Sequence, residues 1–113
     1  MRFILRSKIH TAIVSETNLN YIGSIGIDEN LINKAGLILG EKVLVVDNTN
    51  GSRLETYIIK EEANSGKIAI YGSACHLINK GDEIIIMGFE LSDNPIEPKI
   101  VLVDKNNKFV KFL

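Results

Sequence analysis

Short apolar runs rich in β-branched residues dominate the sequence, and they limit the fold more than any other feature. Each run spans only three or four residues, which suits a strand buried in a sheet. The clusters between them are rich in Gly, Asn and Asp, which accept the backbone angles of tight turns. The runs are 43–46, 57–59, 68–70, 84–87 and 100–103, and the turn clusters are 48–51, 64–66 and 81–82. This spacing predicts an all-β barrel or sandwich, because a parallel α/β sheet needs longer crossover segments.

Two short helical segments are expected beside the strands. Asp28 is a suitable N-cap for a helix that ends at Gly36. The apolar side of this helix is formed by Leu31, Ile32 and Ala35. A second helical turn is expected to begin at Gly72 or Ser73, where small residues follow an apolar run. No linker, repeat or low-complexity tract interrupts the chain, so residues 1–113 are expected to form a single domain.

The composition argues against several classes of protein. Thirteen Lys and Arg residues against 14 Asp and Glu residues leave a net charge of −1, and aromatic residues make up only 6%. This balance offers neither the positive charge nor the stacking surface of a nucleic-acid-binding barrel, so no nucleic-acid partner is expected. No apolar run approaches the roughly 20 residues that span a bilayer, and basic residues interrupt the first apolar stretch too early for an export signal. A cytoplasmic protein without a membrane partner is therefore expected.

The titratable residues give few signs of a conventional active site. Cys75 is the single cysteine, which excludes an intramolecular disulfide, and we expect it to be a small buried hydrophobe. His10 and His76 have no second ligand at metal-binding spacing, so no metal site is expected. The nucleotide-binding, serine-hydrolase and zinc-hydrolase motifs are also missing. The order and spacing of longer segments are therefore the more informative guide to a site.

Four segments in register resemble pyruvoyl-dependent aspartate decarboxylases over most of the chain. They are Ser7-Lys8-Ile9-His10, the stretch 19–28 containing Tyr21-Ile22-Gly23-Ser24, the hairpin 50–57 containing Arg53-Leu54-Glu55-Thr56-Tyr57, and Gly72-Ser73-Ala74 followed by Gly81-Asp82. The resemblance lies in order and spacing, since Gly-Ser alone is a common turn dipeptide. It implies a double-psi β-barrel, mainly β with one or two short helices, in a homotetramer with sites at subunit boundaries.

The resemblance also implies that the chain cuts itself between Gly23 and Ser24, giving residues 1–23 and 24–113. The Ser24 hydroxyl attacks the Gly23 carbonyl, and the resulting ester eliminates and hydrolyses to leave a pyruvoyl group in place of the serine. Gly23 has no Cβ and is expected to allow a strained backbone with an open carbonyl. The pyruvoyl ketone forms a Schiff base with L-aspartate and accepts the electrons released with CO₂, giving β-alanine for pantothenate and coenzyme A synthesis. The sequence leaves open whether processing needs a maturation factor.

The remaining site roles implied by the family fall on the same segments. Thr56 is expected to polarise the scissile carbonyl and later contact substrate, and Tyr57 to protonate the decarboxylated carbon. Lys8 and Arg53 are expected to bind substrate carboxylates. Further backbone donors are expected from Gly72, Ser73 and Ala74. Because Thr56 and Tyr57 point to opposite faces of a regular strand, both can enter one pocket only if the strand is irregular or a second subunit contributes.

Two departures from the family pattern keep alternatives open. Val46 stands where a Trp is common, and Tyr71-Gly72-Ser73-Ala74-Cys75 stands where the family usually reads Asn-Gly-Ala-Ala-Ala. Losing the Asn amide removes a donor and an acceptor beside the pyruvoyl position, while Tyr71 adds bulk and a hydroxyl. One alternative is a pyruvoyl decarboxylase of another small amino acid. The others are a catalytically silent, uncleaved barrel that binds a small acid or a protein, and a nucleic-acid-binding barrel.

Overall fold

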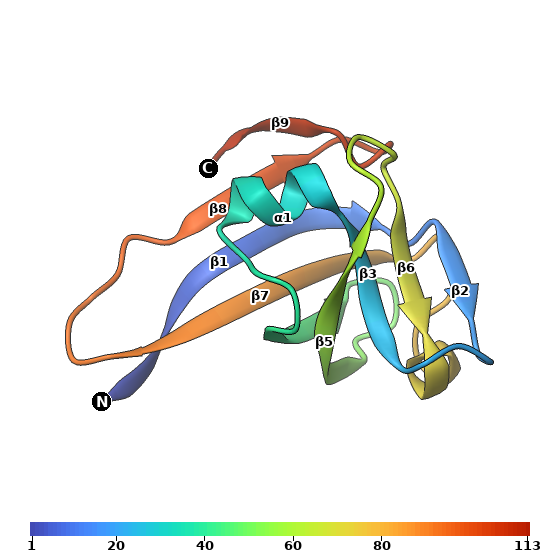
Figure 1. The fold of residues 1–113 in the computed structure, drawn as a ribbon, viewed down its shortest axis with the longest axis horizontal. Helices are drawn as coiled ribbons and strands as arrows, with labels where there is room; N and C mark the ends of the chain where they lie inside the picture. The colour runs from blue at the N-terminus through green and yellow to red at the C-terminus, as the bar shows by residue number, and fades with distance from the viewer.

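The computed structural model describes all of residues 1–113 and contains nine β-strands and two short helices (Figure 1). The strands are β1 (Arg2–Ile13), β2 (Glu16–Asn18), β3 (Ser24–Asp28), β4 (Lys42–Asp47), β5 (Arg53–Glu61), β6 (Ile68–Tyr71), β7 (Glu83–Ser92), β8 (Lys99–Val103) and β9 (Phe109–Phe112). The helices are α1 (Glu29–Ala35) and the 3₁₀ turn η1 (Gly72–His76). Neither helix is long and apolar enough to cross a membrane. The prediction of a mainly β fold with one or two short helices is confirmed.

Each apolar run predicted as a strand lies inside one, in β4 to β8, whereas β1, β2, β3 and β9 lie outside those runs. In β1 the polar and apolar residues are interleaved. Ser7 and Ile9 are fully buried, while Lys8 between them is half-buried. In β3 a glycine, Gly26, separates the two apolar residues. The buried positions of both strands therefore include a serine or a glycine, and their core-facing residues do not stand out as a continuous apolar run.

All nine strands belong to one mixed sheet, in the order β2-β6-β3-β5-β4-β7-β1-β8-β9. The pairs β1/β8, β2/β6 and β3/β5 are parallel. Only Val14 and Ser15 separate β1, well inside the sheet, from β2 at its edge, so the sheet must curl back on itself. The Ser15 N–H donates to the Ile68 carbonyl at 2.8 Å, and this hydrogen bond holds the connection between β1 and β2 against β6. The arrangement agrees with the double-psi barrel that the resemblance implies.

A cluster of 19 buried hydrophobic side chains forms the core. Ile25 of β3 is in register with Ile58 of β5 on one side and with Ile70 of β6 on the other. None of these three side chains is more than 1% exposed. Burying a side chain of this size contributes about 1.5–3 kcal/mol relative to leaving it in water. The core therefore fixes the three neighbouring strands whose ends form the site described below.

The helix α1 follows β3 directly and lies beside β8 (Figure 1). As predicted, Asp28 caps it by accepting a hydrogen bond from the Asn30 N–H at 2.8 Å, and Gly36 ends it with a φ of 72°. The same carboxylate accepts the N–H groups of Asn64 and Gly66, each at 2.9 Å. The buried residues of the helix are the predicted Leu31, Ile32 and Ala35. Asp28 therefore ties together the end of β3, the helix and the turn between β5 and β6.

Candidate active site

A small cleft of about 160 Å³ opens where β3 begins, beside the end of β6 and the middle of β5. This volume is below the range of about 300–1,000 Å³ that is typical of pockets for drug-sized ligands, so the cleft suits a small molecule. The predicted site residues that line it are Gly23, Ser24, Thr56, Ser73 and Ala74. The structure thus brings together most of the residues expected to act in processing.

Ser24 is the first residue of β3 and is only 2% exposed. It is in register with Tyr71 across the antiparallel β3–β6 pair. Its hydroxyl donates a hydrogen bond to the carbonyl oxygen of Ile22 at 2.9 Å. The Ser24 oxygen is therefore held on the N-terminal side of its own residue, close to the peptide that joins it to Gly23. Such proximity is what an intramolecular acyl shift requires.

The backbone packs closely beside the Gly23–Ser24 peptide, and this packing depends on Gly72 rather than on Gly23. Gly23 does not have a left-handed φ, and a Cβ there would lie 3.9 Å from the Tyr71 carbonyl oxygen, which is ordinary van der Waals contact. The structure thus shows neither a left-handed backbone nor a close contact at Gly23, and the expected strain there stays a prediction. Gly72 has a φ of +78°, and a Cβ there would lie 2.6 Å from the Gly23 Cα. Glycine is thus required at position 72, both for its backbone conformation and for the space it leaves.

Strand β5 places its site residues on two opposite faces. Thr56 is half-buried and lines the cleft, while Arg53 and Tyr57 are exposed. The pairing of β5 with β4 runs without a shift from Tyr57 opposite Lys42 to Arg53 opposite Val46. This pairing contains no bulge that would turn Tyr57 toward the cleft. The other expected solution, a contribution from a second copy of the chain, stays a prediction.

Lys8 is not among the residues that line this cleft. It lies on β1, and β5, β4 and β7 stand between β1 and β3 in the sheet. The cations that form ion pairs in the chain are the terminal amine, Arg6, Lys42, Lys60 and Lys67. Lys8 and Arg53 are not among them. Both therefore keep an uncompensated positive charge, which a substrate carboxylate can neutralise.

The expected second helical turn is present as η1, which begins at Gly72. The Leu77 N–H closes its end by donating to the Ala74 carbonyl at 2.9 Å. The first N–H groups of such a turn have no partner inside it, so the Ser73 and Ala74 amides are available as donors at the cleft wall. Cys75 is partly buried against the core, and its thiol donates to the Ile70 carbonyl at 3.3 Å. This placement supports the expectation that Cys75 acts as a small hydrophobe.

Tyr71 belongs to a polar cluster that the sequence did not reveal. Its hydroxyl donates to the Glu61 carboxylate at 2.8 Å and lies 3.4 Å from that of Glu16. Lys67 Nζ lies 3.3 Å from the Glu61 carboxylate and 3.4 Å from that of Glu16. Burial and the hydrogen bond to Glu61 raise the pKa of Tyr71 to about 12, so this phenol stays protonated at neutral pH. The cluster was missed because its members come from β2, β5, β6 and the turn before β6, and meet only in the folded chain.

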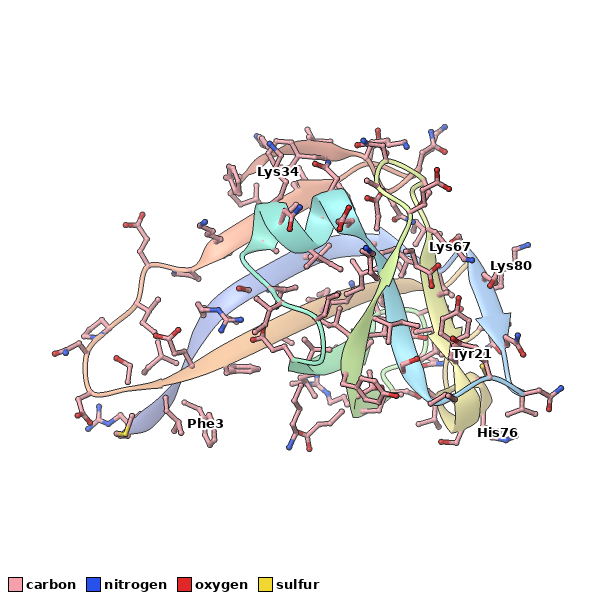
Figure 2. The ribbon with its side chains drawn as sticks, viewed as in Figure 1. Phe3, Tyr21, Lys34, Lys67, His76 and Lys80 are labelled. Carbon is pink, nitrogen blue, oxygen red and sulfur yellow. The ribbon has the colours of Figure 1, made fainter.

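A second, larger hollow of about 600 Å³ lies elsewhere on the surface. Its lining is formed by Phe3, Glu41, Lys42, Val43, Leu44, Glu55 and Phe89. Lys42 and Glu55 pair with each other at 2.9 Å, and the hollow contains none of the predicted site residues. Figure 2 shows Phe3 at the end of the molecule away from Tyr21 and Lys67. The small cleft around Ser24 is therefore the candidate active site.

Comparison with known proteins gives a consistent result. The family model for aspartate decarboxylase matches residues 1–110. The aspartate 1-decarboxylase of Corynebacterium efficiens is 52% identical over 97% of this chain and 84% of its own length. The aspartate 1-decarboxylases of Caldicellulosiruptor saccharolyticus and Acetivibrio thermocellus are 52% and 48% identical, over 96% and 95% of this chain and 88% of their own lengths. With a model match along nearly its whole length and relatives this similar, the chain belongs to the aspartate decarboxylase family.

Proposed function

We propose that this protein converts L-aspartate to β-alanine and CO₂, using a pyruvoyl group that it makes from Ser24. The names of its relatives support the reaction. The observation that carries the self-processing is the position of Ser24, almost fully buried in a small cleft and hydrogen-bonded to the carbonyl two residues before it. A structural serine has no need of a cleft beside its own peptide bond.

Self-cleavage uses atoms that the fold already holds together. The Ser24 Oγ turns from the Ile22 carbonyl and bonds to the Gly23 carbonyl carbon, the peptide C–N bond breaks, and an ester with a free Ser24 amine results. Loss of the Ser24 α-proton then expels the Gly23 carboxylate and leaves dehydroalanine. One water hydrolyses this group, releasing ammonia and leaving a ketone at position 24. Thr56, at the cleft wall, is the hydroxyl placed to donate to the carbonyl oxygen as it gains charge.

The cleft residues fit this group and a small dicarboxylic substrate. When formed, the pyruvoyl ketone supplies an electron sink for the electron pair left by departing CO₂. The Ser73 and Ala74 amides, at the wall, bind one substrate carboxylate, and Thr56 contacts the substrate after cleavage. Lys8 and Arg53 supply the positive charge that balances the two carboxylates of aspartate.

Because Tyr57, Arg53 and Lys8 lie outside the cleft of their own chain, we propose that another copy supplies them, in a homotetramer with its sites between subunits. Tyr57 then protonates the carbon that has lost CO₂. Hybrid assemblies test this sharing. Co-expression of Ser24→Ala chains with Tyr57→Phe chains should give more activity than either variant alone, because some sites combine an intact Ser24 with an intact Tyr57. Hybrids without such a gain would place Tyr57 in the site of its own chain.

Denaturing mass spectrometry of the purified protein tests the processing. We expect two chains, 1–23 and 24–113, the second without a free amino terminus and reactive toward hydrazides. Ser24→Ala should remain whole, while Ser92→Ala, a matched change at the end of β7, should be cut like the wild type. Intact chain after prolonged incubation would contradict the proposal. Cleavage of Ser24→Ala at the same bond would exclude the hydroxyl attack.

The substrate is tested by CO₂ release from a panel of small amino acids. We expect the highest kcat/KM for aspartate and β-alanine as the product. Formation of α-alanine would mean that the other carboxylate is lost. A higher kcat/KM for another amino acid would favour the alternative that Tyr71 and Ser73 have changed the substrate.

A further inference from the structure

The segment that contains the Gly23–Ser24 bond connects two strands, β2 and β3. One residue of each strand is in register with Tyr71. Tyr71 of β6 is in register with Asn18, the last residue of β2, and with Ser24, the first residue of β3. Residues 19–23 therefore connect two register partners of a single residue. The segment begins and ends beside Tyr71, which makes the position of Tyr71 decisive for the path of the segment.

The middle of the segment contacts the Tyr71 side chain. The rings of Tyr21 and Tyr71 meet edge to face, with centroids 4.8 Å apart and an interplanar angle of 60°. Tyr21 is 52% exposed, and its N–H donates to the Asn18 carbonyl at 3.4 Å. The ring contact is thus the main side-chain anchor of Tyr21. It lies two residues before the peptide that Ser24 attacks.

Tyr71 itself is held firmly. It is 6% exposed, and its hydroxyl donates to Glu61, which in turn pairs with Lys67. The Glu61 side chain occupies the space above Gly26 of β3, where any Cβ would collide with it. Figure 2 shows Lys67 and Tyr21 at the same end of the molecule. The ring of Tyr71 is therefore fixed to the sheet on one side and contacts the segment 19–23 on the other.

We propose that Tyr71 is a positioning residue for self-cleavage, acting through the ring of Tyr21 to hold residues 19–23 so that the Gly23 carbonyl faces the Ser24 hydroxyl. This inference rests on the proposed self-cleavage. Tyr71 takes no part in the bond changes. Its ring limits the paths open to the segment, so that a larger fraction of uncut molecules has the geometry needed for attack.

The rate of self-cleavage in freshly refolded chain tests the coupling. Tyr21→Leu and Tyr71→Leu should each slow cleavage by about three- to tenfold, the range expected for losing one aromatic pair. The double variant should be no slower than the slower single variant, since both changes remove one contact. Tyr21→Phe keeps the ring and should cleave at the wild-type rate. Phe112→Leu removes the other edge-to-face pair of the chain, Phe109–Phe112, and should leave cleavage unchanged.

A second readout does not require cleavage. In Ser24→Ala protein, amide hydrogen exchange of residues 19–23 should speed up when Tyr71→Leu is added, while exchange in the distant β8 stays the same. Unchanged exchange in this segment, or rate losses in the two leucine variants that simply multiply, would overturn the positioning role. If wild-type chain fails to cleave, the proposed function fails as well. If it cleaves and the leucine variants match it, only the role of Tyr71 fails.

Discussion

Thr56 and Tyr57 are adjacent in the sequence but lie on opposite faces of β5, with Thr56 at the wall of the cleft and Tyr57 39% exposed outside it. The chain therefore has Thr56 in the same cleft as the Gly23–Ser24 peptide without any contribution from Tyr57. Cleavage and decarboxylation should for this reason respond differently to changes at these two positions.

Tyr57→Phe should be cleaved like the wild type and then turn over poorly. The ring keeps its place, but the proton donor is lost. A positioned general acid contributes about 10²–10⁴-fold, so kcat should fall by a factor in that range. Steady-state assays on fully cleaved protein, with the pyruvoyl content measured by a carbonyl reagent, check this. Near wild-type kcat at full pyruvoyl content would show that another group supplies the proton.

Thr56→Ala should show the opposite pattern, with impaired cleavage. The loss of one donor to a developing oxyanion typically lowers a rate by about 10²–10³-fold, so the variant should remain mostly uncut after the wild type has finished. Thr56→Ser, which keeps the hydroxyl, should recover most of the cleavage rate. The time course is followed by denaturing gel electrophoresis. Equal rates for the Ala and wild-type proteins would remove Thr56 from the processing step.

Gly72→Ala should destabilise the uncut fold and slow its cleavage. The added Cβ meets the Gly23 backbone and also suffers the left-handed φ. Gly40→Ala is the matched control, because Gly40 has a similar φ of +80° but open space around its Cβ position. Denaturant unfolding in the Ser24→Ala background should show Gly72→Ala to be less stable than Gly40→Ala by about 1–3 kcal/mol, the usual cost of overpacking. Equal losses would mean that the Gly23 backbone shifts easily.

A buried pair of carboxyl groups, Asp47 and Asp82, should make stability depend on pH. Burial and the neighbouring Asp82 carboxyl group raise the pKa of Asp47 above its ordinary value of 3.8. The folded state then holds more protons than the unfolded state in the window above 3.8, so the free energy of unfolding should fall as pH rises through that window. Asp82→Asn removes the neighbouring charge and should make this fall smaller. Urea unfolding of Ser24→Ala protein at a series of pH values measures it.

Asp104 provides a control, because its pKa is shifted in the direction opposite to that of Asp47. Hydrogen bonds from the Lys108 and Asn106 N–H groups lower the pKa of Asp104, so its contribution to stability is lost only as pH falls below its ordinary value of 3.8. Asp104→Asn should therefore leave the slope above that pH unchanged. If Asp82→Asn also leaves the slope of stability against pH unchanged, the Asp47–Asp82 pair does not govern the pH dependence.

The parts of the fold set by local signals could be predicted from the sequence. The helix α1 was predicted with both caps because Asp28 and Gly36 act within one turn of the helix. The opposite faces of Thr56 and Tyr57 followed from strand alternation alone. In contrast, β1 was missed because its buried side is made partly by Ser7, and a buried serine does not stand out in an apolar pattern.

The candidate site was predictable to the extent that family resemblance identified its residues. The requirement for glycine at Gly72 was not, because it depends on how closely Gly23, in the segment before β3, approaches it. The link from Tyr71 to Glu61 and Lys67 was not predictable either, since these contacts depend on the register of β6 against its neighbours. Both features depend on which residues become neighbours when distant segments pair, and patterns within a single sequence do not reveal those pairings.

The position of β1 has a consequence for the mature protein. β1 pairs with β7 on one side and with β8 on the other, and β2 pairs with β6. If the chain is cut before Ser24 as proposed, residues 1–23 stay bound only by noncovalent contacts, chiefly these pairings and the core contacts of Ile9, Ala12 and Val14. Unfolding then separates two molecules, and refolding becomes a second-order reaction whose half-time lengthens on dilution. The uncut chain can refold as one molecule, whereas the proposed cut form would have to rebind residues 1–23, which contain β1 and β2.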